Sequence, residues 1–502
     1  TTPLYSSAAS DVYKRQLLDL LTEGTAIINY IGHGSAHQWA QERLLYQDND
    51  LNRIQTKNKL PLWIAGTCSW GHFDEIETEA FSEEVIRMEN NGASAIISTS
   101  RLISVSSNAY FTREIFKSIF PNGTITNEPI GVIMQAVKDG SPSGELFHLF
   151  GDPGMPLALP HQTVSLTNIS PDTLYTLDTG RVSGTQNIIN GGSGLGFISL
   201  RDAERSVTRE YIINSTEQEL SYSLPGGTLF KGQFSFSGSA FSTLIRVPKD
   251  ISYSDATGTI NVYMVFEGDP AQEALGTFDN IALAGGNSVP DIVGPIISFE
   301  NETGRLIRSG DHFSANETLY LRLSDPLGIN LTGEVGHEIL ITDLVAAVES
   351  DITHLFLYDE NSITTGKIAL DDLIKNKEVE IQVKAWDNAN NPTILTIKLY
   401  ITDDQGLRLF NVFNFPNPFV LETQFSFEIS STAEVSVDIF TLGGRRVCQI
   451  SPQTVTAGYN FINWDGRDKY GDILANGVYL YRIKAKNGNE SISSIGKIAK
   501  YQ

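Results

Sequence analysis

The chain has 502 residues, enough for three or four domains at about 150 residues each. Its 36 Lys and Arg against 59 Asp and Glu give a formal net charge of −23, which argues against a basic nucleic-acid-binding surface and against docking on anionic lipid by charge alone. An apolar content of 41% can fill several hydrophobic cores. The sequence contains no run of about 18 apolar residues that would predict a transmembrane helix, and its two cysteines are too few for a disulfide framework.

The first 16 residues, Thr1–Gln16, show no hydrophobic period, and we interpret them as a possible non-native junction without regular structure. The sequence begins with Thr1 rather than Met, and its first residues contain no apolar stretch like the core of a signal peptide. We therefore expect the chain to be a fragment that lacks its natural N-terminus.

Residues 17–160 alternate short apolar runs with helical patterns. The apolar runs suit strands buried on both faces of a parallel sheet, and they are TAIINYIG (Thr25–Gly32), LPLWIAGT (Leu60–Thr67) and GASAIISTS (Gly92–Ser100). Amphipathic helices are predicted over Glu79–Asn90, Asn108–Phe120 and Pro129–Lys138. Strands that alternate with helices predict an α/β domain.

After His161 the pattern changes to polar–apolar alternation broken at Gly, Asn and Asp, which is typical of antiparallel, half-exposed strands. A Gly- and Pro-rich joint at Gly285–Pro295 marks a further boundary. The predicted fold class is multidomain: a partial α/β domain followed by three β-rich domains, with boundaries at 161–292 (β-rich), 293–402 (Ig-like sandwich) and 403–502 (C-terminal sandwich).

Two residues that can carry covalent catalysis follow neighbouring predicted strands. His33 lies between two glycines in NYIGHGS, and Cys68 follows the next apolar run in WIAGTCSWG. Both lie at carboxyl ends of strands, where open α/β sheets hold ligands. A thiol with a pKa of about 8.5 attacks as thiolate, and an imidazole beside it raises the thiolate fraction and can protonate a leaving amine.

The backbone N–H groups of Gly34 and Cys68 are candidates for an oxyanion hole, in which one donor contributes about 3–4 kcal/mol. Trp70 and His72 are candidates to line a substrate cleft, although a Trp after such a turn can equally cap the core. We interpret Asp74 as an acid that holds its loop and Arg101 as a partner in a surface ion pair.

Other interpretations of these residues remain open. A lone Cys at a strand end is often a small buried hydrophobe. His33 with His37, and Cys68 with His72, have the four-residue spacing of zinc ligands, but glycines interrupt the helix that this spacing needs. We expect no metal and no cofactor at the site. Calcium in the acidic stretch FDEIETEAFSEE has no specific motif behind it, and acids also suit the first turn of a helix.

At these residues the chain resembles the gingipain-like cysteine peptidases, whose domain is caspase-like. The resemblance rests on NYIGHGS, PLWIAGTCSWGHFDE, GASAIISTSR and LFGDPGMPL. Within the family it is most similar to the sortase-type peptidases of the bacterial type IX secretion system, on the basis of the stretches Leu323–Asp343, Asn411–Ile429, Ile439–Val447 and Asn463–Ala485. The resemblance extends from Leu17 to the C-terminus.

The resemblance implies that Cys68 is the nucleophile, that His33 is the acid/base, and that Gly34 and Cys68 supply the oxyanion N–H groups. It places the acidic partner of the histidine and much of the specificity pocket upstream of His33. It also implies a secreted or outer-membrane-associated bacterial endopeptidase that cleaves C-terminal secretion signals of cargo proteins, with an outer-membrane secretion protein as partner. The alternatives are a secreted gingipain-like protease of broader specificity and a catalytically incomplete binding module.

Overall fold

The computed structural model describes residues 4–187, 192–213, 216–267, 272–286, 289–314, 317–333, 336–370, 378–402, 407–488 and 490–501. The chain divides into two compact units. The first contains Thr1–Thr163 with two short later segments, Gln186–Ile189 and Val265–Leu275, and the second contains the rest. The four-part division expected from the sequence remains a prediction.

The first unit is built on a four-stranded sheet of order β1-β5-β6-β7. Strands β1 (Ile27–Ile31), β5 (Leu62–Gly66) and β6 (Ala95–Thr99) run parallel to one another, and β7 (Phe147–Gly151) is antiparallel to β6. The three apolar runs are therefore confirmed as parallel strands. β7 was not predicted, because its sequence leads directly into the Gly-Asp-Pro-Gly turn.

Side chains alternate between two hydrophobic cores, one on each face of this sheet. Trp63 and Ala65 of β5 point into a core that includes the rings of Trp39 and Trp70. Leu62 and Ile64, one residue out of step, belong to a second core that the helices α4 and α5 share. Every residue of β5 and β6 is buried, as expected for strands covered on both faces.

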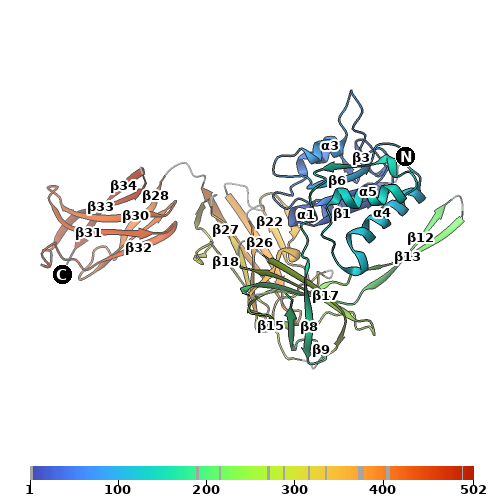
Figure 1. Ribbon diagram of the computed structural model, residues 1–502. Coiled ribbons are helices and arrows are strands. Elements are labelled where there is room, and N and C mark those ends of the chain that lie inside the picture. The colour runs from blue at the N-terminus through green and yellow to red at the C-terminus, as the bar shows by residue number, and fades with distance from the viewer. Residues whose placement is uncertain are drawn as a thin grey trace. The chain divides into compact units, whose positions relative to one another are not determined.

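The predicted helices are confirmed with shifted ends. Figure 1 shows α4 and α5 beside the sheet of the first unit. The Ser104 hydroxyl accepts a hydrogen bond from the Ser107 N–H at 3.1 Å and so caps α4. The helices of this unit are α1 (Leu4–Glu23), α2 (Gln47–Asp50), α3 (Phe81–Ile86), α4 (Val105–Ile119) and α5 (Ile130–Gly140), with 3₁₀ turns at Leu51–Arg53, Pro121–Gly123 and Gly144–Leu146.

The expectation that Thr1–Gln16 lacks regular structure is wrong from Leu4 onward, because this stretch forms most of α1. The segment has no hydrophobic period, but six of the 13 residues Leu4–Gln16 are Ala, Leu, Lys, Arg or Gln, which have good helix propensity, and neither Gly nor Pro interrupts it. Leu18 and Leu21, in the last turns of α1, are buried in the first core.

The second unit consists of β-sheets, as predicted. One sheet of 13 strands follows the order β15-β10-β8-β17-β16-β11-β14-β24-β25-β21-β18-β19, with β9 paired to β17. Its strands are β8 (Gln162–Ser170), β9 (Thr173–Tyr175), β10 (Thr179–Gln186), β11 (Ser193–Arg201), β14 (Thr228–Ser237), β15 (Ala240–Arg246), β16 (Gly258–Phe266), β17 (Gln272–Ala284), β18 (Ile296–Glu300), β19 (Leu306–Ile307), β21 (Tyr320–Ser324), β24 (Leu357–Glu360) and β25 (Thr365–Ala369).

Two smaller sheets accompany it. A five-stranded sheet contains β20 (His312–Ser314), β22 (Leu340–Asp343), β23 (Val348–Asp351), β26 (Glu378–Trp386) and β27 (Pro392–Thr402), with a 3₁₀ turn at Thr353–Leu355. A separate ribbon pairs β12 (Arg205–Ile213) with β13 (Thr216–Leu224).

The C-terminal part forms a sandwich of two antiparallel sheets around one core, which includes Phe425, Ile439, Trp464 and Tyr481. Figure 1 shows it in orange and red. Its three-stranded sheet contains β28 (Leu409–Phe415), β29 (Thr423–Ile429) and β32 (Gly458–Trp464), and its four-stranded sheet contains β30 (Ala433–Thr441), β31 (Arg446–Val455), β33 (Gly477–Asn487) and β34 (Glu490–Lys500).

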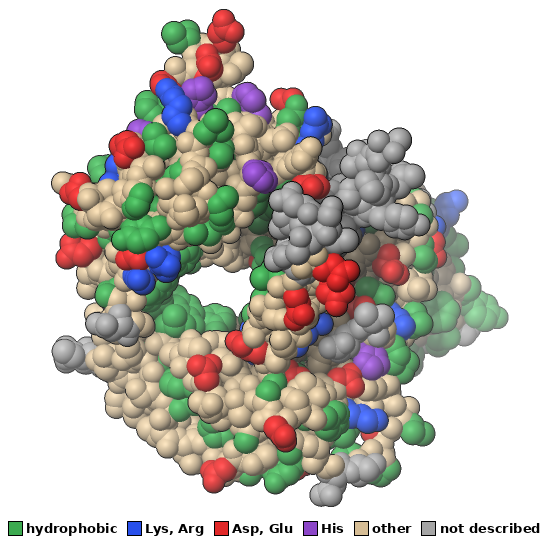
Figure 2. Space-filling model, turned by 90° about the vertical axis from the view of Figure 1, so that its right-hand side faces the viewer, with side chains coloured by type: hydrophobic (Ala, Val, Ile, Leu, Met, Phe, Trp, Pro, Cys, Tyr) green, Lys and Arg blue, Asp and Glu red, His purple; other side chains and the backbone are tan. Residues whose placement is uncertain are grey.

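Each helix of the described residues is too short or too polar to span a lipid bilayer. On the face drawn in Figure 2, acidic side chains lie in small scattered groups with Lys and Arg between them. This distribution is that of a solvated acidic surface.

Candidate active site

The strand register places His33 and Cys68 at the same edge of the sheet, each after one of two neighbouring strands. β1 and β5 are parallel neighbours, and their last paired residues are Ile31 and Gly66. The Gly32 N–H continues the pairing with a 3.3 Å hydrogen bond to the Gly66 carbonyl. Because His33 lies two residues beyond Ile31 and Cys68 two residues beyond Gly66, both follow the same edge of the sheet. His33 is exposed and Cys68 is half-buried, so both are accessible to a ligand.

A small hairpin fixes the backbone of His33. The His33 carbonyl accepts hydrogen bonds from the Ala40 N–H and from the Tyr30 hydroxyl, both at 2.7 Å. The hairpin strands are β2 (Gly34–Ser35), β3 (Gln38–Trp39) and β4 (Leu45–Tyr46).

The same hairpin leaves the Gly34 N–H outside its ladder. His33 and Ala40 form a hydrogen-bonded pair, so Gly34 and Trp39, the next pair, are a non-hydrogen-bonded pair of the antiparallel ladder. The Gly34 N–H therefore points away from its hairpin partner. This orientation is what an oxyanion donor at Gly34 requires.

Gly34 also packs directly on Thr67, the residue before Cys68. A Cβ at position 34 would lie 2.3 Å from Thr67 Oγ1 and 2.9 Å from the Gln38 carbonyl oxygen. Thr67 is fully buried. Glycine is therefore required here for the close approach of the two loops.

The turn that carries Cys68 is held by the loop between β6 and α4. Ser69 has a left-handed backbone with φ of 56°, and its N–H donates to the Arg101 carbonyl at 3.2 Å. The Gly71 N–H donates to the Thr99 carbonyl at 2.9 Å. Cys68 Sγ lies 3.8 Å from the Ile103 carbonyl oxygen.

The two cleft candidates have different surroundings. Trp70 is fully buried, with its ring 5.0 Å from Trp39 and 5.9 Å from Trp63 and from Phe81, centroid to centroid. The prediction that Trp70 lines a cleft is wrong, because its large apolar ring completes the core instead. His72 is partly exposed, and its Nε2 lies 3.4 Å from Asp74 Oδ1.

Asp74 and Arg101 form the surface ion pair that was predicted for the arginine. Arg101 Nη1 lies 2.8 Å from Asp74 Oδ1, and Nη2 lies 2.5 Å from Oδ2. The hydrogen bonds from Arg101 lower the pKa of Asp74 to about 2. The carboxylate is therefore charged throughout the pH range in which a thiol peptidase works.

Two residues near the site were not recognised in the sequence. Asn108 is buried in α4 and donates its amide to the Gly66 carbonyl, at the end of β5. His148 on β7 lies 3.0 Å from Ser100 Oγ through its Nε2, and burial lowers the pKa of its imidazole. His148 interrupts the apolar run Leu146–Phe150, which was an available signal, whereas Asn108 directly follows Ser106 and Ser107 and carries no such signal.

The zinc interpretation finds no geometry to support it. His37 Nδ1 lies 2.5 Å from Gln47 Oε1, and the His72 ring faces Asp74. Within the described ranges, His33, His37, Cys68 and His72 do not supply three ligand atoms close enough for one ion.

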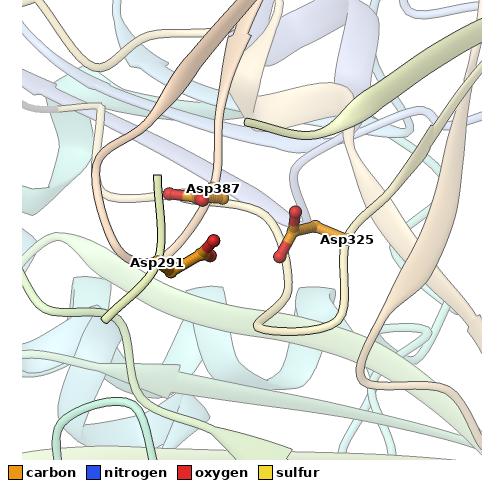
Figure 3. Close-up of side chains that lie close together, drawn as sticks. All are labelled: Asp291, Asp325 and Asp387. Atoms are coloured by element: carbon orange, nitrogen blue, oxygen red, sulfur yellow. The ribbon is translucent and has the colours of Figure 1, made fainter. Parts of the chain in front are cut away.

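A separate acidic cluster lies in the second unit. Asp291, Asp325 and Asp387 point their carboxylates toward one another, with one oxygen of each within 4.8 Å of the others (Figure 3). Asp325 and Asp387 are buried. Burial raises the pKa of Asp325 to about 6, and the neighbouring carboxylates add to this shift.

This cluster predicts a pH-dependent stability. The folded state binds a proton at Asp325 that the unfolded chain, with a pKa of 3.8, releases, so the unfolding free energy should fall as the pH rises from about 4 to about 6. At pH 7, Asp325→Asn should raise it by about 2–3 kcal/mol, at 1.36 kcal/mol per pKa unit. Urea titrations at pH 4.5 and 7 measure both effects. Added calcium chloride that stabilises the wild type but not the variant would contradict this account and assign a cation to the cluster.

Comparisons with known proteins matched two parts of the chain to family models. Residues 2–158 match the family model "Peptidase family C25", and residues 417–489 match the "FlgD Ig-like domain" model. No curated protein matches significantly.

Among solved structures, dimeric latent PorU from Porphyromonas gingivalis is 24% identical, covers 82% of this chain and 41% of its own, and has a TM-score of 0.31. This chain thus spans about two fifths of the length of that protein. SGBP-B of the mixed-linkage glucan utilization locus from Bacteroides ovatus is 11% identical, covers 60% of this chain and 64% of its own, and has a TM-score of 0.19. Residues 2–158, which include His33 and Cys68, match peptidase family C25, the gingipain family of cysteine peptidases, and this match identifies a gingipain-type peptidase domain in the N-terminal part of the chain.

Proposed function

We propose that this chain is the catalytic and C-terminal part of a PorU-type sortase, a cysteine endopeptidase that removes C-terminal secretion signals from cargo proteins. The observation that supports the proposal is that His33 and Cys68 follow the paired ends of β1 and β5 at one edge of the sheet, with Gly34 in a non-hydrogen-bonded pair of its hairpin. The sequence resemblance of the downstream stretches to that subfamily supports the choice of cargo signals as substrate.

The reaction would proceed through a thioester. The Cys68 thiolate attacks the peptide carbonyl, and the Gly34 and Cys68 N–H groups stabilise the oxyanion. The carbon–nitrogen bond then breaks, and His33 gives the leaving amine its proton. An amine of a cell-surface acceptor, or water, then attacks the thioester and loses its proton to His33, and the carbon–sulfur bond breaks to return the Cys68 thiolate.

The setting that we propose is the bacterial cell surface, with the protein secreted or associated with the outer membrane as part of the type IX secretion system. Its partners would be the cargo signal and an outer-membrane secretion protein. The acidic surface suits exposure to solvent, and its negative charge argues against nucleic acid as a partner.

The test is Cys68→Ala in the full-length protein. Cargo signals should remain uncleaved, and a dipeptidyl acyloxymethyl ketone should label the wild type at Cys68. Cargo processing at the normal rate in Cys68→Ala would refute the proposal. Cleavage of many unrelated proteins by the wild type would favour the broader protease, and a wild type that the ketone does not label would favour a binding module.

A further inference from the structure

Two loops from different strands meet beside the nucleophile. The first follows β5 and carries Cys68, Ser69 and Asp74; the second follows β6 and carries Arg101 and Ile103. Their backbones touch where the Ser69 N–H donates to the Arg101 carbonyl, and Cys68 Sγ lies against the Ile103 carbonyl oxygen. The position of the thiol therefore depends on where the second loop lies.

The conformation of Ser69 needs external support. A left-handed backbone at a residue other than glycine costs about 1–2 kcal/mol, and it persists only where the surroundings enforce it. Ser69 follows Cys68 directly, so its φ sets the direction in which the Cys68 carbonyl leaves the turn. The enforcing contact is the hydrogen bond to the Arg101 carbonyl.

The Asp74–Arg101 ion pair joins the same two loops a second time. It is bidentate, with Nη1 donating to Oδ1 and Nη2 donating to Oδ2, a geometry that fixes orientation as well as distance. Arg101 Nη1 also donates to the Ser100 carbonyl at 2.8 Å, which ties the side chain to its own loop. The side chains of Asp74 and Arg101 are 44% and 49% exposed, and a pair so exposed contributes little to overall stability.

We propose that Asp74 and Arg101 are positioning residues for the peptidase reaction: their ion pair holds the β6–α4 loop against Ser69, and this contact orients the Cys68 thiol and N–H toward the substrate carbonyl. The inference rests on the proposed function. In this role neither side chain needs to touch the substrate. The Arg101 guanidinium stays paired with Asp74 and does not bind a substrate carboxylate.

The test compares two arginines of the first unit that both form exposed ion pairs. Arg101→Gln breaks the pair with Asp74, and Arg87→Gln, the matched control, breaks the pair with Glu79. The probe is the dipeptidyl acyloxymethyl ketone, in which the Cys68 sulfur displaces the carboxylate leaving group. Because a misplacement of about 1 Å can cost a hundredfold, Arg101→Gln should lower the maximal labelling rate about tenfold or more, with the half-saturating probe concentration within about threefold.

Three further measurements separate positioning from a merely structural role, in which the ion pair would only stabilise the fold. Positioning predicts that the unfolding midpoint of Arg101→Gln stays within about 3 °C of the wild type, that Arg87→Gln labels at the wild-type rate, and that Arg101→Lys recovers part of the lost rate. Equal labelling rates for Arg101→Gln and Arg87→Gln would overturn the inference while leaving Cys68 as nucleophile. A wild type that does not label at Cys68 would remove the proposed function itself, so the two failures are distinguishable.

Discussion

Gly34→Ala is expected to lower the rate of Cys68 labelling by the dipeptidyl ketone about a hundredfold or more. The added methyl would lie 2.3 Å from Thr67 Oγ1 and 2.9 Å from the Gln38 carbonyl oxygen, distances that no Cβ tolerates. Thr67 is fully buried and directly precedes Cys68, so relief of the clash must move the nucleophile, the Gly34 N–H, or both. A displacement of about 1 Å at a reacting centre is enough for an effect of this size.

Gly140→Ala is the control for this prediction. Gly140 ends α5 in the same unit, and a Cβ there meets no atom within 4 Å. Thr67→Ala added to Gly34→Ala should recover part of the rate, because the nearest clashing atom, Thr67 Oγ1, has no hydrogen-bond partner among the described residues. If Gly34→Ala labels as fast as Gly140→Ala, the Gly34 N–H is not part of the oxyanion site.

The two loops of the candidate site could be predicted from the sequence, because in a parallel sheet the position of a residue after its strand indicates the edge at which it lies. Runs of apolar residues marked β1 and β5, and in a parallel sheet the residues that follow such strands meet at one edge. His33 and Cys68 were recognisable on this basis. The Gly34 N–H direction was not, since it depends on the hairpin register between Gly34 and Trp39.

Other features could not be predicted, for reasons that differ from residue to residue. For Trp70 the sequence left a cleft and a core position equally open, because the left-handed φ of Ser69, which precedes the buried ring, follows from no pattern. The Asp291, Asp325 and Asp387 cluster joins residues from three loops far apart in the chain. The α1 helix has propensity without periodicity, and a method based on periodicity overlooks it.

Trp70→Ala is expected to destabilise the first unit by about 3–5 kcal/mol, the range for loss of a buried Trp ring. Trp70 is fully buried, and its ring contacts Trp39, Trp63 and Phe81. Removal leaves a cavity between rings that are themselves on the sheet and on α3, so the space cannot close without moving the backbone. Urea denaturation followed by near-ultraviolet circular dichroism, which reports the packing of these rings, measures the loss.

The same experiment decides between a core and a cleft role for Trp70. Leu102→Ala, at a side chain that is 79% exposed in the β6–α4 loop, is the control and should change the unfolding free energy by less than about 0.5 kcal/mol. Trp70→Phe keeps an aromatic ring in the core and should retain part of the stability. If Trp70→Ala unfolded at the wild-type urea concentration but labelled slowly at Cys68, the ring would serve the substrate. If Trp70→Ala lost stability but still labelled at Cys68 at urea concentrations below its unfolding transition, the ring would belong to the core. A core ring supports the turn that carries Cys68 without contacting the ligand.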